Sequence, residues 1–253
     1  MIEAFLARAM LAGLRIGGLM TFAPFFGNAS LPNQAKAGLT IALTALLLPA
    51  YSAGAMATPD HIGNWAALAL SEIAIGMLIG YSTQLVFEGM ELAGQIVGFQ
   101  FGFSLVNVID PNSQVEVTVL SSFHELIALL LFMQLGVQRW LLRATAASFR
   151  LIPIGSFARH VPGPAFLRAA TAMWLIGAEI AFPVVIGTMV LDLTVGFLAK
   201  AAPQFPALFF GISAKYLMGL AVLYGTIAFW PSLLEKYFMH ALRTLERLLE
   251  MAS

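Results

Sequence analysis

Residues 88–118 read EGMELAGQIVGFQFGFSLVNVIDPNSQVEVT, and this stretch organises the rest of the chain. Its glycines Gly94, Gly98 and Gly102 recur every fourth residue and would line one face of a helix, where small residues let two helices pack closely. The same packing role is expected of two other glycine pairs: Gly76 with Gly80, and Gly13 with Gly17. The helix should end at Asp110-Pro111, because a proline disfavours helical geometry at the residue before it. The stretch contains several acids and no Lys or Arg. In a chain this apolar, it is the strongest candidate for a functional segment.

Composition places the chain outside the class of ordinary soluble domains. Of its 253 residues, 60% are hydrophobic and 10% charged, with a mean hydropathy of +0.87. Soluble domains carry about 25% charged residues. An integral membrane protein, or part of a large apolar assembly, is therefore expected. The formal net charge is zero, so charge gives no argument for nucleic acid. Cysteine is absent, which excludes disulfides and thiolate metal sites.

Six apolar blocks follow one another along the chain. They cover residues 5–26, 37–57, 65–87, 119–138, 169–198 and 205–230. A membrane helix needs roughly 20 mostly apolar residues. Only the second block meets this length without an ionisable residue. Helices facing lipid do not tolerate ionisable groups at the rate seen in the other five. We therefore expect these helices to line a polar path or to pack against other protein.

The arginines predict an orientation in the membrane. They gather in the link after the fourth block and, with a lysine, in the C-terminal tail. These residues are Arg139, Arg143, Arg150, Arg159 and Arg168, followed by Lys236, Arg243 and Arg247. The opposite set of links holds little beyond Lys36 and Lys200. With six crossings both basic regions share one side, which the positive-inside rule makes cytoplasmic.

The tail, residues 233–250, predicts an amphipathic helix that lies on a surface or against a partner. Leucines and one phenylalanine recur in it at helical spacing, with charged residues elsewhere around the helix. The apolar positions are Leu234, Phe238, Leu242, Leu245 and Leu249.

Neither a metal site nor an enzyme is expected. His124-Glu125 begins a run that resembles a zinc-protease signature, but the second histidine is missing because position 128 is Ala128. The pair is interpreted as a helix start at a membrane boundary. The serines lack the turn that exposes a catalytic nucleophile. No cofactor is predicted.

Three acids lie inside apolar blocks: Glu72, Glu179 and Asp192. Acids at such positions often form proton relays. The alternative is a structural hydrogen bond or a pair between subunits, and for any single acid we favour it over a relay. None of the three has a basic residue at helical spacing.

Longer runs of sequence carry a family resemblance. The run GQIVGFQFGFSLVNVIDPNSQ, followed by FHELIALLLFMQLGVQRWLLRATAASFRLIPIG, resembles the FliR family of flagellar biosynthetic proteins, whose injectisome relatives are the SctT proteins. FAPFFGNASLPNQAKAGLTIALTALLLP and LDLTVGFLAKAAPQFPALFFGISAKYLMGL fit the same family. The chain departs from the family's pattern at Val137-Gln138-Arg139-Trp140, where Gly-His often precedes the tryptophan. It departs again at Phe205-Pro206-Ala207, where an asparagine is common.

The resemblance implies an all-α fold of membrane-type helical hairpins within a helical export-gate assembly raised largely out of the bilayer plane. Residues 1–183 would form a FliP-like part, and residues 184–253 a FliQ-like hairpin with an amphipathic C-terminal helix. The junction falls near Pro183.

The same resemblance implies a non-enzymatic core subunit of the flagellar type III export gate, located in the bacterial inner membrane at the flagellar basal body. Its partners would be FliP-like and FliQ-like subunits, FlhB-like and FlhA-like export proteins, unfolded protein substrates and membrane lipid, without nucleic acid. A plug loop would span about residues 103–117. The positions expected to form the plug or gate are Gly98, Gln100, Gly102, Phe103, Val106, Asn107, Asp110 and Pro111.

Two other functions stay open. The first is the corresponding gate subunit of an injectisome. The second is a secondary transporter that uses the acids inside the apolar blocks to couple ion movement. A transporter of that class predicts discontinuous helices in matching halves. The sequence shows one proline-broken loop and no evident counterpart, which disfavours a transporter.

Overall fold

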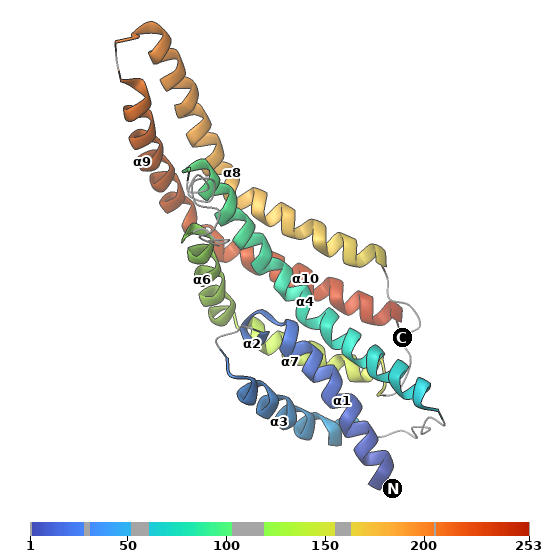
Figure 1. Ribbon diagram of the computed structural model, residues 1–253. Helices are drawn as coiled ribbons and strands as arrows, with labels where there is room; N and C mark the ends of the chain where they lie inside the picture. The colour runs from blue at the N-terminus through green and yellow to red at the C-terminus, as the bar shows by residue number, and fades with distance from the viewer. Residues whose placement is uncertain are drawn as a thin grey trace. The chain divides into compact units, whose positions relative to one another are not determined.

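The computed structural model describes residues 2–27, 31–51, 61–102, 119–154, 163–204 and 206–252 (Figure 1). Within these ranges the chain is helical and contains no strand. The helices are α1 (Ile2–Phe22), α2 (Pro24–Gly27), α3 (Asn33–Tyr51), α4 (Ile62–Gln100), α6 (Val119–Gln134), α7 (Val137–Leu151), α8 (Gly163–Ala201), α9 (Ala207–Ile227) and α10 (Trp230–Ala252). The predicted all-α fold is confirmed.

The chain divides into two compact units. The first unit comprises Met1–Leu85, Phe132–Ala170 and Phe238–Ser253, and the second comprises Val86–Leu131 and Thr171–Tyr237. The core of the first unit contains α1, α7 and the first part of α4, with α3 in contact with α1. In the second unit the last part of α4 packs with α6, α8 and α9. The predicted boundary at residue 183 lies inside α8, where Pro183 does not end the helix, and it stays a prediction.

Four helices of the described chain are long and apolar enough to cross a membrane. They are α1, α4, α8 and α9, and the bent pair α6 and α7 makes a fifth if it is counted as one span. This agrees with an integral membrane protein. The second block, expected to be the cleanest span, is not among them. The described part of α3 opens with the polar residues Asn33, Gln34 and Lys36, which lower its mean hydropathy.

The helix α4 is longer than the sequence suggested. It joins the third apolar block to the glycine-rich run in 39 residues, about 58 Å at a rise of 1.5 Å per residue. It ends at Gln100, well before the predicted stop at Asp110, so that prediction was wrong. The reason is Gly102, whose φ of 76° lies in the left-handed region that follows many helix ends.

The first part of the arginine-rich link after the fourth block forms the helix α7. Gly136, with φ 69°, separates α6 from α7, and the two helices meet at a bend of 67°. Along α7 the buried residues include Leu141, Ser148 and Phe149, while the arginines at 139, 143 and 150 are exposed. A glycine in the left-handed region allows this turn, because a side chain there would be strained.

The predicted amphipathic helix is confirmed as α10, but its apolar face packs within the chain and not on a membrane surface or a partner. Its five apolar positions, from Leu234 to Leu249, are each no more than 5% exposed. Phe238 contacts Phe132 within the first unit, with ring centroids 5.8 Å apart. The helix tolerates Pro231 because it lies in the first turn, where its missing N–H has no partner to lose.

Candidate functional site

The structure describes three of the eight predicted plug or gate residues. Gly98 is buried in α4, Gln100 is the half-buried last residue of that helix, and Gly102 follows it. Phe103, Val106, Asn107, Asp110 and Pro111 lie outside the described residues. The structure therefore shows how the predicted plug segment begins.

Among the three glycines at positions 94, 98 and 102, called the glycine row below, Gly94 makes a close helix contact. A β-carbon at Gly94 would overlap the backbone of Ser121, so α4 and α6 touch backbone to backbone there. Gly102 lies beyond the end of α4, so only Gly94 and Gly98 of the predicted glycine row share a helix face. Elsewhere on α4, Gly76 and Gly80 lie against the backbone of α1. Their predicted packing role is confirmed.

In α1 the glycine in close contact with another helix is not one of the two that were predicted. A β-carbon at Gly13 or Gly17 would lie at ordinary distances, 3.7 and 4.0 Å, from threonine side chains of α3. The glycine that approaches α4 closely is Gly18, where a β-carbon would lie 2.7 Å from the carbonyl oxygen of Ile73. The spacing of small residues indicated a packed face, but could not identify the glycine that meets the neighbour.

Phe101 anchors the end of α4 to α9. It is 4% exposed, and its ring meets that of Tyr216 edge to face at a centroid distance of 5.7 Å. A β-carbon at Gly219 would overlap the Phe101 ring, so the phenylalanine occupies the space that this glycine leaves on α9. Phe101 therefore has a packing role immediately before the predicted plug segment.

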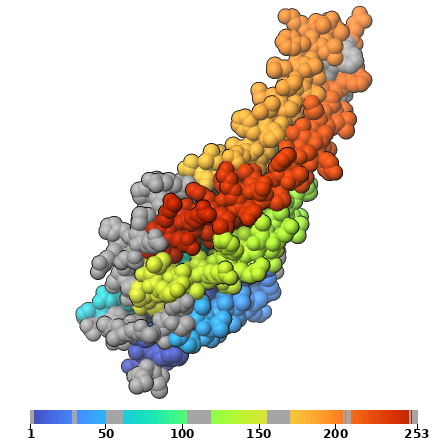
Figure 2. Space-filling model, turned by 180° about the vertical axis from the view of Figure 1, so that it is seen from behind, coloured from blue at the N-terminus to red at the C-terminus, as the bar shows by residue number. Residues whose placement is uncertain are grey.

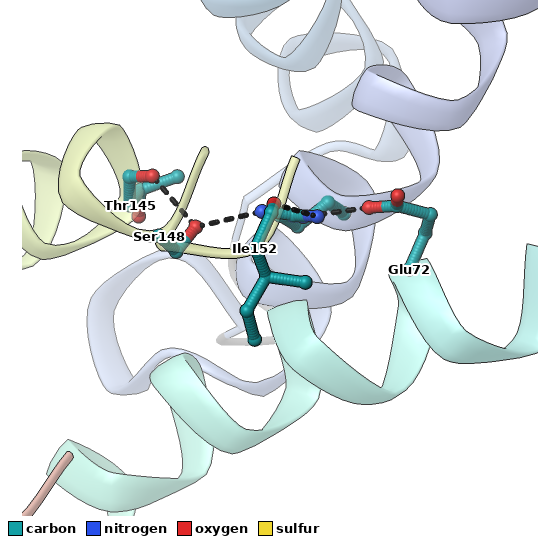
Figure 3. A network of polar contacts seen from close by, with 5 residues as sticks. Glu72, Thr145, Ser148 and Ile152 are labelled. Carbon is teal, nitrogen blue, oxygen red and sulfur yellow. Dashed lines mark hydrogen bonds and ion pairs between the residues drawn. The ribbon is translucent and has the colours of Figure 1, made fainter. Parts of the chain in front are cut away.

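A buried polar network in the first unit joins α1, α4 and the end of α7 (Figure 3). The Arg15 Nε donates to Glu72 Oε2 at 2.6 Å, and both side chains are fully buried. The other guanidinium nitrogens donate to Ser148 Oγ at 3.1 Å and to the carbonyl oxygen of Ile152 at 3.0 Å. The guanidinium carbon also lies 4.4 Å from the centroid of the Phe149 ring.

This network explains why an acid and a base are tolerated inside apolar helices. Removing two charges from water is costly, and the cost is offset only when further hydrogen bonds satisfy the remaining donors and acceptors. Ser148 supplies an acceptor to Arg15 and itself donates to the carbonyl oxygen of Thr145 at 2.7 Å. The network requires Arg15, Glu72 and Ser148 to meet, which fixes the relation of three helices.

The acids of α8 differ in how they are satisfied. Lys215 Nζ on α9 donates to Asp192 Oδ2 at 2.6 Å, so this pair links the two helices of the hairpin. Glu179 is exposed and accepts a hydrogen bond from Tyr237. No described cation forms a salt bridge with Glu179. Burial, followed by the hydrogen bond and the charge of Glu179, raises the pKa of Tyr237 to about 12. Partners of this kind favour the structural interpretation of the acids over a proton relay.

His124 is a core residue and not a helix start at a boundary. It is fully buried one turn inside α6, where Nδ1 lies 2.7 Å from the carbonyl oxygen of Leu120. Its ring lies against Trp230, with centroids 4.8 Å apart. The adjacent Glu125 is exposed. Across the described ranges, no group of three His, Cys, Asp or Glu side chains could hold a metal ion.

An apolar cavity of about 350 Å³ lies between α6 and α9 in the second unit. Its lining is almost entirely hydrocarbon: Val119, Leu120, Phe123, Leu220, Leu223, Tyr224 and Ile227. Tyr224 supplies the one hydroxyl among these side chains. The cavity therefore carries no set of polar groups suited to catalysis.

The features of the described site are structural: close helix contacts, an anchored helix end and paired charges. The family model for bacterial export proteins, family 1, matches residues 6–241. The chain belongs to this family. The match includes every described residue of the Arg15 network and of the α4 end, so both features lie within the part of the chain shared with the family.

Relatives of this export-family chain include flagellar biosynthetic proteins FliR. A flagellar biosynthetic protein FliR of Escherichia coli K12 is 29% identical over 213 residues, covering 83% of this chain and 80% of the relative. FliR of Pectobacterium carotovorum is 29% identical over 228 residues, covering 89% and 86%. FliR of Buchnera aphidicola from Baizongia pistaciae is 27% identical over 234 residues, covering 90% and 88%. The predicted FliR-family membership is confirmed.

Proposed function

We propose that this chain is a core subunit of the flagellar type III protein export gate and forms part of its secretion pore and plug. Membership of the export family and likeness to FliR proteins along nearly the whole chain carry the proposal. At the coarser level the chain is a membrane-embedded component of a flagellar export apparatus. Its partners in the gate would be FliP-like and FliQ-like subunits, with FlhB-like and FlhA-like proteins nearby, in the inner membrane.

The plug is proposed to begin at the end of α4. Phe101 holds this end against Gly219 of α9, and Gly102 turns the backbone out of the helix. A plug must move when a polypeptide passes, yet it must return to the same position. A segment whose first residue follows a buried anchor meets the second requirement. The residues assigned to the plug remain Gly98, Gln100, Gly102, Phe103, Val106, Asn107, Asp110 and Pro111.

The charge pattern supports a conduit over a transporter. Glu72 and Asp192 each have a basic partner in the structure. A transporter that couples ions through these acids needs carboxylates that bind and release cations in turn. An acid whose charge is already neutralised by arginine or lysine is poorly suited to that task.

The first experiment removes the gene from a flagellated host and restores it on a plasmid. The expected result is loss of swimming and of exported filament protein, both restored by the wild-type gene. If swimming persists without the gene and secretion of injectisome substrates fails instead, the injectisome assignment replaces the flagellar one.

The second experiment tests the plug. Removing four residues between positions 103 and 115 should make the closed gate leak small ions, because the apolar obstruction becomes too short to exclude water. The matched control removes four residues from 155–162, a second stretch between helices. Membrane conductance that stays at the wild-type level in the first variant, with the complex assembled, would contradict the plug assignment.

A further inference from the structure

We infer that Phe101 is a positioning residue of the proposed gate. Its ring stays in the space at Gly219 of α9 while the gate opens, so that movement of the plug begins after Gly102. This inference rests on the proposed function, because it assigns a fixed end to the plug segment of the same gate. Phe101 acts through the segment that follows it and does not itself obstruct the passage.

The backbone at the end of α4 is hydrogen-bonded up to Gly102. The N–H of Phe101 donates to the carbonyl oxygen of Val97 at 3.1 Å, and the N–H of Gly102 donates to that of Phe99 at 3.0 Å. The second bond spans three residues and closes a tighter final turn. Gly102 then adopts the left-handed conformation, with φ 76°. The first backbone torsions that follow the last helix hydrogen bond are therefore those of Gly102.

The side chain of Phe101 fits a space that only a glycine leaves. Phe101 is 4% exposed, whereas Phe99, two residues earlier, is 70% exposed. A β-carbon at Gly219 would overlap Cε1 and Cζ of the Phe101 ring and would lie 3.3 Å from Cδ1. Tyr216, one helical turn before Gly219, meets the same ring edge to face, a favourable arrangement of two aromatic rings. Any side chain at position 219 would therefore displace the ring.

The helix that carries Gly219 is itself held in place. In both views α9 lies side by side with α8 (Figure 1 and Figure 2). Lys215 of α9 donates to Asp192 of α8. A β-carbon at Gly211 or Gly187 would lie 2.9 or 3.3 Å from a valine side chain of the facing helix. Segments with many buried contacts open less readily than those with few, so we expect the Phe101 contact to persist while the following segment moves.

A change in side-chain size tests the fit. Gly219→Ala places a carbon where the Phe101 ring lies, so the ring must leave its space and the plug segment loses its fixed end. The expected result is a rise in membrane conductance through the closed gate, with the complex still recovered. Gly225→Ala on the same helix is the matched control, since a β-carbon there meets no heavy atom within 4 Å. Equal conductance of the two variants would overturn the inference.

A second substitution distinguishes a lost fit from general damage to α9. Leucine has no atoms equivalent to Cε1 and Cζ of phenylalanine, so Phe101→Leu should restore low conductance when it is combined with Gly219→Ala. The control adds Phe99→Leu, at the exposed position, and should restore nothing. A double variant with Phe101→Leu that conducts as much as Gly219→Ala alone would contradict the assigned fit.

Crosslinking tests whether the contact persists in the open gate, and it does not depend on the assembly of Gly219→Ala. The chain has no cysteine, so Phe101→Cys with Gly219→Cys supplies two thiols that dibromobimane can join. The expected result is a crosslink in the assembled apparatus, with export of filament protein at the rate of the same variant without the reagent. The wild-type chain with reagent controls for effects on other proteins.

Two outcomes of the crosslinking experiment would overturn the inference. Export that stops after crosslinking would show that the contact must separate for a polypeptide to pass. An assembled complex in which the two thiols cannot be joined would show that the two positions do not meet.

The proposed function is decided separately, by complementation of swimming and by the deletion between positions 103 and 115. A leak caused by the deletion, without a leak from Gly219→Ala, would reject only the positioning role. A crosslink between positions 101 and 219, in a chain whose gene can be removed without effect on swimming, would reject only the flagellar assignment.

Discussion

The first unit and the α8–α9 hairpin both carry charged residues within apolar helices, but they satisfy these charges in different ways. In the first unit, Arg15 and Glu72 are fully buried and their network is completed within the chain. In the hairpin, Asp192 and Lys215 pair at a partly exposed position, and among the described residues the neutral Tyr237 donates to Glu179. The comparison teaches that the charges of the first unit are buried and neutralised between its own helices, whereas those of the α8–α9 hairpin stay partly exposed.

Breaking the buried pair should have the largest effect. Arg15→Met removes the buried cation that neutralises Glu72, which costs about 3–5 kcal/mol. We expect loss of the protein from membranes, measured by its steady-state amount and its resistance to protease. The double variant Arg15→Met with Glu72→Leu should recover much of the loss, because no charge then stays buried alone. If the single variant accumulated to the wild-type amount, the network would not be needed for the stability of the protein.

Crowding the contact between α1 and α4 should have the next largest effect. A side chain at Gly76 would overlap the carbonyl oxygen of Arg15, so Gly76→Leu must push the helices apart. Overpacking of this kind costs typically about 1–3 kcal/mol. Thermal unfolding of the solubilised protein measures the loss. Gly63→Leu on the same helix is the control, since a β-carbon there meets no atom within 4 Å. Equal unfolding temperatures for the two variants would contradict the proposed close contact.

Breaking the hairpin pair should have a small effect on the isolated chain. An exposed ion pair contributes about 0–1 kcal/mol, so Lys215→Met should lower thermal stability far less than Arg15→Met does. Asp192→Asn provides the reciprocal variant. A loss as large as that of the buried pair would erase the distinction between the two regions.

The smallest expected effect concerns the Tyr237 phenol. Its pKa of about 12 lies above the ordinary value of about 10, so the neutral phenol is favoured in the folded chain. Its contribution to stability is therefore complete below about pH 10 and is lost as pH rises toward 12. Tyr237→Phe should remove the most alkaline part of the phenolate absorbance titration of the wild-type protein. A titration that this substitution leaves unchanged would show that Tyr237 has no raised pKa.

Periodicity predicted much of the fold, because burial of an apolar helix face leaves a repeat in the sequence. The tail residues from Leu234 to Leu249 repeat at helical spacing and are buried in α10. The end of α4 was misplaced because a proline is a stronger local signal than a glycine. Gly102 ends the helix by adopting a left-handed backbone conformation, which the neighbouring residues do not predict.

The candidate site was predicted less well, since its contacts join distant parts of the chain. Arg15 and Glu72 are separated by 57 residues, and Lys215 and Asp192 by 23. A search for bases at helical spacing could not find either partner. The anchoring of Phe101 depends on the space at Gly219, which no pattern near residue 101 indicates.

The sequence by itself determined that this is an all-α, membrane-type chain of an export family, because composition, periodicity and family motifs are carried by the order of residues alone. Only the tertiary structure decided which charges are paired and which glycines bring helices together. Those properties depend on distances between segments far apart in the chain. An acid in an apolar block has the same local sequence whether an arginine neutralises it, as at Glu72, or a tyrosine hydroxyl donates to it, as at Glu179.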